Sequence, residues 1–125
     1  LLVIRQEGEA WEKPFVVVLE PTVGKKSTVK TVEELKVGNK VVGAKVVSML
    51  HNKKIIDYII CNDKNESIAL PKFSISFQGH YGIIRIEQYK NEENISLYIG
   101  DGKNLAYKEK KLKVKSNSNK AYQKF

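Results

Sequence analysis

The sequence predicts an all-β domain built as an antiparallel β-sandwich. Short apolar or alternating segments recur along the chain, and turn-forming residues separate them at regular intervals. A helical pattern extends over no more than about one turn anywhere in the chain. Many short strands joined by turns are typical of an antiparallel sandwich. With 125 residues, the chain is long enough for one domain whose core forms without disulfides or a structural metal.

Three segments in the N-terminal half predict strands. Residues 15–19 are a continuous apolar run bounded by prolines, and their three consecutive valines favour a buried strand. Residues 45–50 and 54–61 flank the turn-like residues 51–53, and this arrangement predicts a hairpin.

One short segment carries a helical signal. Thr31 and Glu34 have the spacing of a capping box, which predicts a helical start at residues 31–35. Gly38 follows so soon that we expect no more than about a turn of helix there.

Two strands are expected between residues 73 and 89. Residues 73–77 alternate strictly, so we expect an inward-facing row of Phe73, Ile75 and Phe77. Gly79 is expected to end this strand. Residues 81–89 form the next strand, with Ile84 and Ile86 on one face. The opposite face carries Ile83, Arg85, Glu87 and Tyr89.

The remaining strands follow the same logic. Residues 91–94 are a polar turn, and residues 95–99 form a strand with Ile95, Leu97 and Ile99 aligned. Residues 100–103 predict another turn, because Gly100 and Gly102 permit positive φ. Residues 105–107 and 111–115 form the last pair, with Leu112 and Val114 pointing inward.

The domain is expected to cover residues 1–115. Residues 116–125 are polar and carry lysine, so they predict a C-terminal tail that is ordered only if Tyr122 or Phe125 docks. The chain begins in the middle of a pattern and its one methionine is Met49. We therefore expect it to be a fragment of a longer protein.

The chain is basic through lysine. It has 22 Lys and Arg against 14 Asp and Glu, a net charge of +8, and Arg5 and Arg85 are the two arginines. Such an excess supports contact with a polyanion. The scarcity of arginine and the absence of a nucleic-acid-binding motif count against nucleic acid as a partner. No segment approaches the roughly 18 apolar residues of a membrane span.

Cysteine and histidine are too few for a metal site. Cys61 has no partner for an intrachain disulfide, and His51 and His80 do not complete the roughly four ligands of a structural zinc. We therefore expect no metal and no cofactor. Cys61 ends an apolar strand with no cation beside it, which predicts a small buried side chain rather than a reactive thiol.

Aromatic residues near cations are the candidate binding residues. Aromatic rings and cations suit stacking against sugars and contact with carboxylate or sulfate, and they suit single-stranded nucleic acid as well. The alternative is that these rings cover sheet edges and the rim of the core. The candidate substrate-binding residues are Tyr81, Arg85, Tyr89 and Tyr98, with Tyr107 and Trp11 as further exposed aromatics.

His80 and Tyr81 are the one pair that could move protons. Adjacent residues on a strand point to opposite faces, so the pair does not converge on one substrate. A carboxylate partner within their reach cannot be shown from the sequence. We therefore expect no catalytic residue in this chain.

A series of short motifs resembles, in order, those of one enzyme family. The motifs are residues 14–21 (PFVVVLEP), 29–32 (VKTV), 57–59 (DYI), 62–63 (ND), 77–82 (FQGHYG) with Arg85, and 97–105 (LYIGDGKNL). Over residues 14–114 the chain resembles the C-terminal sandwich of heparinase II/III-type polysaccharide lyases. Such lyases combine an α/α toroid with β-sandwich domains and cleave acidic polysaccharides, glycosaminoglycans among them, by β-elimination.

The resemblance implies a non-catalytic accessory domain. The family's catalytic groups lie in the cleft between toroid and central sandwich, outside the matched region, so no catalytic residue carries over. The implied partners are the preceding domains of the parent chain and an acidic polysaccharide, and the implied location is extracytoplasmic, periplasmic or secreted. The alternative is an independent carbohydrate-binding module for an acidic glycan.

Overall fold

The computed structural model describes residues 16–20, 24 and 26–125. Trp11, a predicted exposed aromatic, and Phe15, the first residue of the predicted strand 15–19, lie outside these residues. The described chain is almost entirely antiparallel strand, and the predicted all-β fold is confirmed. Its elements are β1 (Val29–Val37), β2 (Lys40–Leu50), β3 (Lys53–Cys61), β4 (Ser67–Leu70), the 3₁₀ turn η1 (Pro71–Phe73), β5 (Ile75–Tyr89), β6 (Glu92–Tyr107), β7 (Lys110–Lys113) and β8 (Ala121–Lys124).

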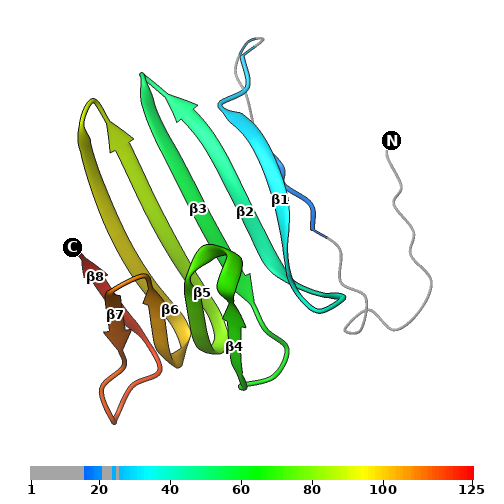
Figure 1. Ribbon diagram of the computed structural model, residues 1–125, viewed down its shortest axis with the longest axis vertical. Helices are drawn as coiled ribbons and strands as arrows, with labels where there is room; N and C mark the ends of the chain where they lie inside the picture. Colours follow the sequence, from blue (N-terminus) through cyan, green and yellow to red (C-terminus); the bar gives the residue numbers. More distant parts are fainter. Residues whose placement is uncertain (1–15, 21–23, 25) are drawn as a thin grey trace.

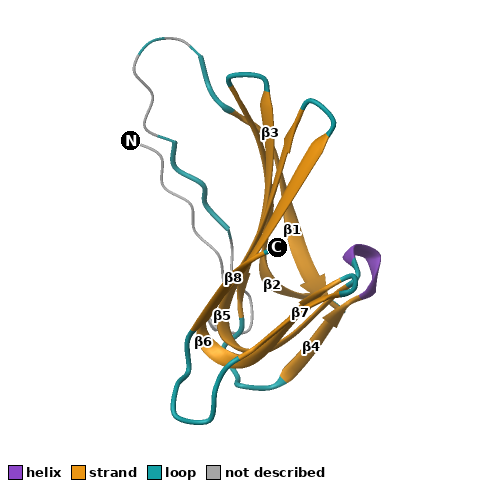
Figure 2. Ribbon diagram, turned by 90° about the vertical axis from the view of Figure 1, so that its left-hand side faces the viewer, coloured by secondary structure: helices purple, strands orange, loops and turns teal. Residues whose placement is uncertain are grey.

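One hydrogen-bonded sheet folds over to make both layers of the sandwich. The large layer contains β1, β2, β3, the C-terminal half of β5, the N-terminal half of β6, and β8. The small layer contains β4, the other halves of β5 and β6, and β7. Figure 1 shows β5 and β6 running through both layers, and Figure 2 shows the small layer turned away from the large one.

Close approach of β5 and β6 produces the bend between the layers. The register of this pair shifts on both sides of Gly79, which has a φ of +156°. A Cβ atom at Gly79 would lie 2.5 Å from the backbone oxygen of Asp101. Two predictions are therefore wrong: β5 passes through Gly79 without ending, and residues 100–103 are strand. Gly100 and Gly102 are needed for space rather than for positive φ, because side chains at these positions would collide with the opposite strand.

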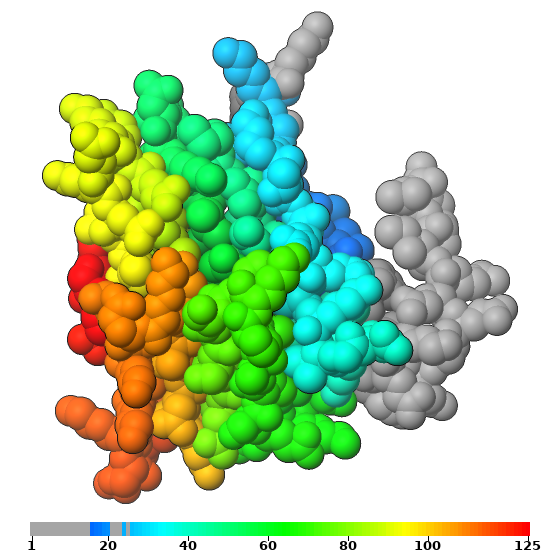
Figure 3. All heavy atoms as spheres, in the orientation of Figure 1, coloured from blue at the N-terminus to red at the C-terminus, as the bar shows by residue number. Residues whose placement is uncertain are grey.

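The core lies between the facing sides of the two layers. Alternation along each strand points one set of side chains inward. The space-filling view in Figure 3 shows β4 (green) and β7 (orange) lying over the lower part of the large layer. The predicted inward residues Ile75, Phe77, Ile84, Ile86, Ile95, Leu97, Ile99 and Leu112 are all buried, and Val114 packs against them.

Two local predictions were wrong in the type of element. Residues 31–35 belong to β1, because pairing with β2 outweighs the weak capping signal. Phe73 ends η1, and Ser74 follows with a φ of +55°, so β5 begins only at Ile75. The Phe73 ring is partly buried and lies 5.3 Å from the Tyr58 ring, so the residue joins the rim of the core without being in a strand.

The apolar run at the N-terminus is not a buried strand in its described part. Val16 to Leu19 make no ladder with the sheet, and Leu19 is 86% exposed. Figure 2 shows this segment on the side of the large layer opposite to the small layer. A chain that crosses the face of a sheet cannot share the hydrogen bonds that run in the plane of the sheet. The segment is held instead by Glu20, whose carboxylate accepts a hydrogen bond from the Thr28 backbone N–H at 2.7 Å.

The hairpin of β2 and β3 and the C-terminal tail complete the sheet. The hairpin is confirmed, with His51 and Asn52 at φ of +50° and +62° as its two-residue turn. The next turn contains Lys90 and Asn91, one residue earlier than predicted, and β6 begins directly at Glu92. Residues 121–124 of the expected tail form β8 beside β6, and the Phe125 N–H donates to the Ile95 carbonyl at 2.8 Å. Within the described residues, no helix has the length and hydrophobicity to span a membrane.

Candidate functional site

Three of the four candidate residues, Tyr81, Arg85 and Tyr98, lie close together on the outer face of the large layer, the side turned away from the core. Strand pairing places Arg85 between Asp57 on β3 and Ser96 on β6. Ile83, two residues before Arg85 on β5 and on the same face, lies between Ile59 and Tyr98. Tyr98 in turn pairs with Tyr122 on β8. Paired residues in neighbouring strands share a face, so these side chains form one continuous surface.

A shallow hollow of about 420 Å³ lies on this surface. Its lining combines one aliphatic side chain with a serine, two tyrosines and three charged groups. The lining residues are Ile83, Arg85, Glu87, Ser96, Tyr98, Tyr122 and Lys124. Tyr122 and Lys124 lie in the part of the chain that the sequence predicted as a tail, and only the pairing of β8 with β6 brings them to this site.

Arg85 forms an ion pair with Asp57. Its Nε donates to one oxygen of Asp57 at 2.7 Å, and its second nitrogen, NH2, donates to the other oxygen at 2.9 Å. The hydrogen bond with Asp57 raises the pKa of Arg85 further above its usual range. This two-point geometry neutralises the guanidinium and fixes its plane. The pair makes Arg85 a poor partner for an additional anion.

Tyr81 packs beside Tyr98 at the bend. Their ring centroids are 6.2 Å apart, and the planes meet edge to face at 79°. The Tyr81 ring covers Gly100, where a Cβ would lie 2.5 Å from Tyr81 Cδ1. Burial raises the pKa of the Tyr81 hydroxyl. The two rings therefore form a fixed aromatic wall.

The other predicted aromatics do not join this group. Tyr89 lies at the far end of β5, 43% exposed, with the Lys90 ammonium 5.3 Å from its ring centroid. It lines a separate hollow at the hairpin end with Leu50 and Ile55. The prediction that Tyr107 is exposed was wrong, because the residue is in the core, 6.0 Å from the Tyr58 ring.

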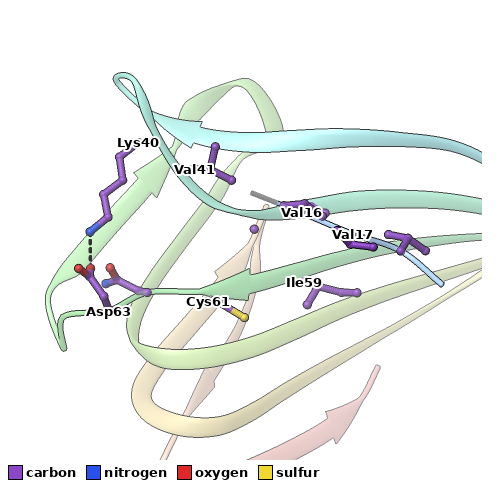
Figure 4. A pocket seen from close by; sticks show the side chains of 11 residues that line it. Val16, Val17, Lys40, Val41, Ile59, Cys61 and Asp63 are labelled. Carbon is purple, nitrogen blue, oxygen red and sulfur yellow. Dashed lines mark hydrogen bonds and ion pairs between the residues drawn. The ribbon is translucent and has the colours of Figure 1, made fainter. Parts of the chain in front are cut away.

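A second hollow, of about 500 Å³, lies between the N-terminal segment and the outer face of β2 and β3. Figure 4 shows Val16 and Val17 across from Ile59 and Cys61, with the Lys40–Asp63 ion pair at one end. Cys61 is exposed, so its prediction as a buried residue was wrong: it follows Ile60 and therefore points to the outer face. Partial desolvation still raises the pKa of its thiol, which disfavours the reactive thiolate.

The sequence could not show that His80 has a carboxylate partner. Its Nδ1 lies 3.1 Å from an Asp101 oxygen, and the other Asp101 oxygen accepts from the Asn119 amide at 3.1 Å. These two hydrogen bonds lower the pKa of Asp101. The three side chains are exposed and link β5, β6 and the loop before β8. Among the described residues, no group of three or more potential ligands is placed to hold a metal ion.

Comparisons with known proteins point to one kind of enzyme. A family model described as the endo-acting ulvan lyase C-terminal domain matches residues 29–125. The chain is also 49% identical over 108 residues to an endo-acting ulvan lyase of Formosa agariphila; the match covers 86% of this chain and 13% of that protein. No solved structure matches.

These comparisons confirm the resemblance to the C-terminal domain of a polysaccharide lyase. The narrower assignment to the heparinase II/III type does not follow from them. Since the family match covers most of the chain and all eight strands, the chain belongs to the endo-acting ulvan lyase C-terminal domain family.

Proposed function

We propose that this chain is the non-catalytic C-terminal accessory domain of a polysaccharide lyase that cleaves an acidic polysaccharide by β-elimination. The support is the family match together with the relative, an endo-acting ulvan lyase of which the matched region is 13%. Ulvan is therefore the first substrate to test. The sequence motifs further support a parent with the toroid-and-sandwich organisation of heparinase II/III-type lyases that works outside the cytoplasm.

The observation that carries the accessory role is the character of the outer face of the large layer. Exposed apolar and aromatic side chains lie along it, among them Val32, Leu50 and Tyr122. Residues 16–20, through which any preceding domain connects to β1, cross the same face. Apolar surface of this kind is typical of contacts between domains. We therefore place the contact with the preceding domain on this face.

The charged groups of this face favour a structural role over catalysis. Asp57 holds Arg85 in a two-point ion pair, and Glu87 lies 3.7 Å from the Lys53 ammonium. A general acid or base has to be within reach of the substrate proton and free to exchange it. Carboxylates that are paired with cations do not meet this requirement.

An independent module for an acidic glycan is the second candidate. The hollow between Tyr98 and Tyr122 favours it, because Tyr122 is 63% exposed and Lys124 has no carboxylate partner among the described residues. In this case the substrate contacts are Tyr81 and Tyr98, with Tyr89 further along β5, and Arg85 joins them only where the glycan displaces Asp57.

One experiment tests the accessory role directly. The 125-residue chain and its full-length parent are incubated with ulvan, heparin, chondroitin sulfate and alginate, and unsaturated products are measured against boiled controls. We expect products from the parent and none from the chain alone. Product formation by the chain itself would overturn the proposal.

A surface variant separates the two candidates. Tyr122→Asp introduces a charge on the outer face at an exposed side chain, and Asn91→Asp, in the turn between β5 and β6, is the matched control. If the face contacts the preceding domain, Tyr122→Asp lowers the melting temperature of the parent and leaves that of the chain unchanged. If the face binds glycan, the variant lowers the glycan affinity of the chain and leaves the melting temperature of the parent unchanged.

A further inference from the structure

The positive charge of the chain is concentrated at its C-terminal end. Residues 103–125 contain eight lysines and one glutamate, so they carry seven of the eight net charges. The first 102 residues are close to neutral. Charge asymmetry of this degree indicates an interaction surface in the basic part.

The fold places part of this charge on the outer face of the small layer. One cross-strand row contains Ala69, Ser76, Ala106 and Lys111, and the next contains Ser67, Gln78, Asn104 and Lys113. We call these two rows the basic face. None of the eight residues is buried. The side chains in its centre are small, so a ligand can lie close to the strands.

The polar groups of the basic face are ordered but not saturated. The Asn104 amide donates to the Gln78 side-chain oxygen at 3.1 Å, which fixes the orientation of both amides. Within the described part of the chain, the Gln78 amide nitrogen and the Asn104 side-chain oxygen make no other side-chain hydrogen bond, so both can contact a ligand. Beside them, Ser76 offers a hydroxyl.

The lysines of the basic face differ from Arg85 and Lys53 on the outer face of the large layer. Among the described residues, no carboxylate lies within 4.0 Å of the Lys111 or Lys113 ammonium. Arg85 and Lys53, by contrast, are both paired with acids. An unpaired surface cation keeps its full attraction for an anionic ligand. Two such cations on alternate residues of β7 lie on the same side of the strand.

We infer that the basic face binds the carboxylate or sulfate groups of an acidic polysaccharide. Lys111 and Lys113 contact the anionic groups, and Ser76, Gln78 and Asn104 hydrogen-bond to sugar hydroxyls. This inference rests on the proposed function. It adds a polysaccharide contact on the outer face of the small layer, whereas the proposed contact with the preceding domain is on the outer face of the large layer. Lysine contributes point charges without the two-point geometry of arginine, so the binding is salt-sensitive and tolerant of anion position.

The test measures affinity of the full chain for ulvan, for a neutral glucan and for single-stranded DNA at low and at physiological salt. The variant is Lys111→Gln with Lys113→Gln, which keeps both side chains polar and exposed. We expect ulvan binding to weaken about fivefold for each lysine removed. A second variant, Asn104→Asp, keeps the shape of the face and adds a negative charge, and it should also weaken binding.

The matched control is Lys54→Gln with Lys64→Gln, the same loss of charge at exposed positions on the large layer and in the β3–β4 loop. We expect the control to change ulvan affinity less than twofold. Equal weakening by both double variants shows that net charge alone drives binding and overturns the inference, as does tighter binding to DNA than to ulvan. If the parent cleaves ulvan while the variant with Lys111→Gln and Lys113→Gln binds ulvan unchanged, the basic face is not the binding surface and the proposed function stands.

Discussion

Gly79 and Gly102 lie opposite each other across β5 and β6, so close that a Cβ on Gly79 would be 2.5 Å from the Gly102 Cα. The sheet turns from its large layer into its small layer at this contact. The core depends on that turn, because it places Phe77 and Leu105 over the large layer. The close approach of the two strands at the bend therefore requires glycine at both positions.

Gly79→Ala should destabilise the domain by about 2–4 kcal/mol, because it combines a disfavoured φ with a backbone collision. Gly38→Ala is the matched control: its φ is +61°, but nothing lies within 4 Å of the added Cβ. The control should cost about 1–2 kcal/mol. Urea unfolding of both variants measures the difference. Equal losses at the two positions would mean that the close approach at the bend carries no cost.

Phe77→Ala should cost about 3–5 kcal/mol, since the ring is buried between the layers. Tyr89→Ala, at an exposed position on the same strand, should change the free energy of unfolding by less than about 0.5 kcal/mol. Thermal unfolding of the two variants compares a core face with an outer face directly. A stable Phe77→Ala beside an unfolded Tyr89→Ala would reverse the assignment of the two faces.

Glu20 should make the anchoring of the N-terminal segment sensitive to acid. Hydrogen bonds from Ser27, Thr28 and Val29 lower the pKa of its carboxyl from 4.5 to about 2. A carboxyl whose pKa is lower in the folded state stabilises that state above its unfolded pKa, and the stabilisation is lost as the pH falls from about 4.5 to about 2. The protection factor of the Thr28 amide, which is its exchange rate relative to the intrinsic rate at the same pH, should fall across this window.

Two variants test the role of Glu20 in this acid response. Glu20→Gln should remove the pH dependence of the Thr28 protection factor between pH 5 and pH 2. Glu92→Gln, at an exposed carboxyl at the start of β6, is the control and should leave it in place. If the Thr28 protection factor still falls with pH in Glu20→Gln, another carboxyl anchors the segment.

Asp57 and Arg85 should show a measurable coupling in stability. Both hydrogen bonds of the pair have good length, but Arg85 is half exposed, so water screens part of the attraction. A double-mutant cycle with Asp57→Asn and Arg85→Gln should give a coupling of about 1 kcal/mol, smaller in high salt. A coupling of zero at low salt would show that the pair does not persist in solution.

The core could be predicted from the sequence, and the path of the long strands could not. Alternation in residues 73–77, 81–89 and 95–99 identified most buried residues, because inward and outward positions follow from local pattern alone. Glycines at residues 79 and 100 were misread, since a glycine that permits a turn and a glycine that permits close contact look alike in sequence.

The candidate site depends on strand pairing, which limits what sequence can show. The pairs Arg85–Asp57 and His80–Asp101 join residues 28 and 21 positions apart, and neither is visible without the register. Tyr122 was missed as a site residue because its segment looked like a tail. Its two aromatic residues, Tyr122 and Phe125, were the one sequence signal that the tail could dock, and the Phe125 N–H does donate to the Ile95 carbonyl.

Removal of residues 121–125 should destabilise the domain and expose a strand edge. β8 pairs with residues 96–99 of β6, and Phe125 adds a backbone hydrogen bond to Ile95. Loss of these backbone bonds should cost about 2 kcal/mol. The freed edge of β6 should then pair with a second copy, because an uncovered edge strand is a template for association.

The control for this truncation is Tyr122→Ala, which removes an exposed side chain and keeps the backbone pairing. Thermal unfolding and sedimentation velocity of both proteins separate the two effects. We expect the truncated chain to melt at a lower temperature and to associate as its concentration rises. Tyr122→Ala should match the unmutated 125-residue chain in both measurements. If truncation changes neither the melting temperature nor the association state, β8 does not contribute to the stability of the sheet or cover its edge. Residues 116–125 then act as the polar tail that their composition predicts.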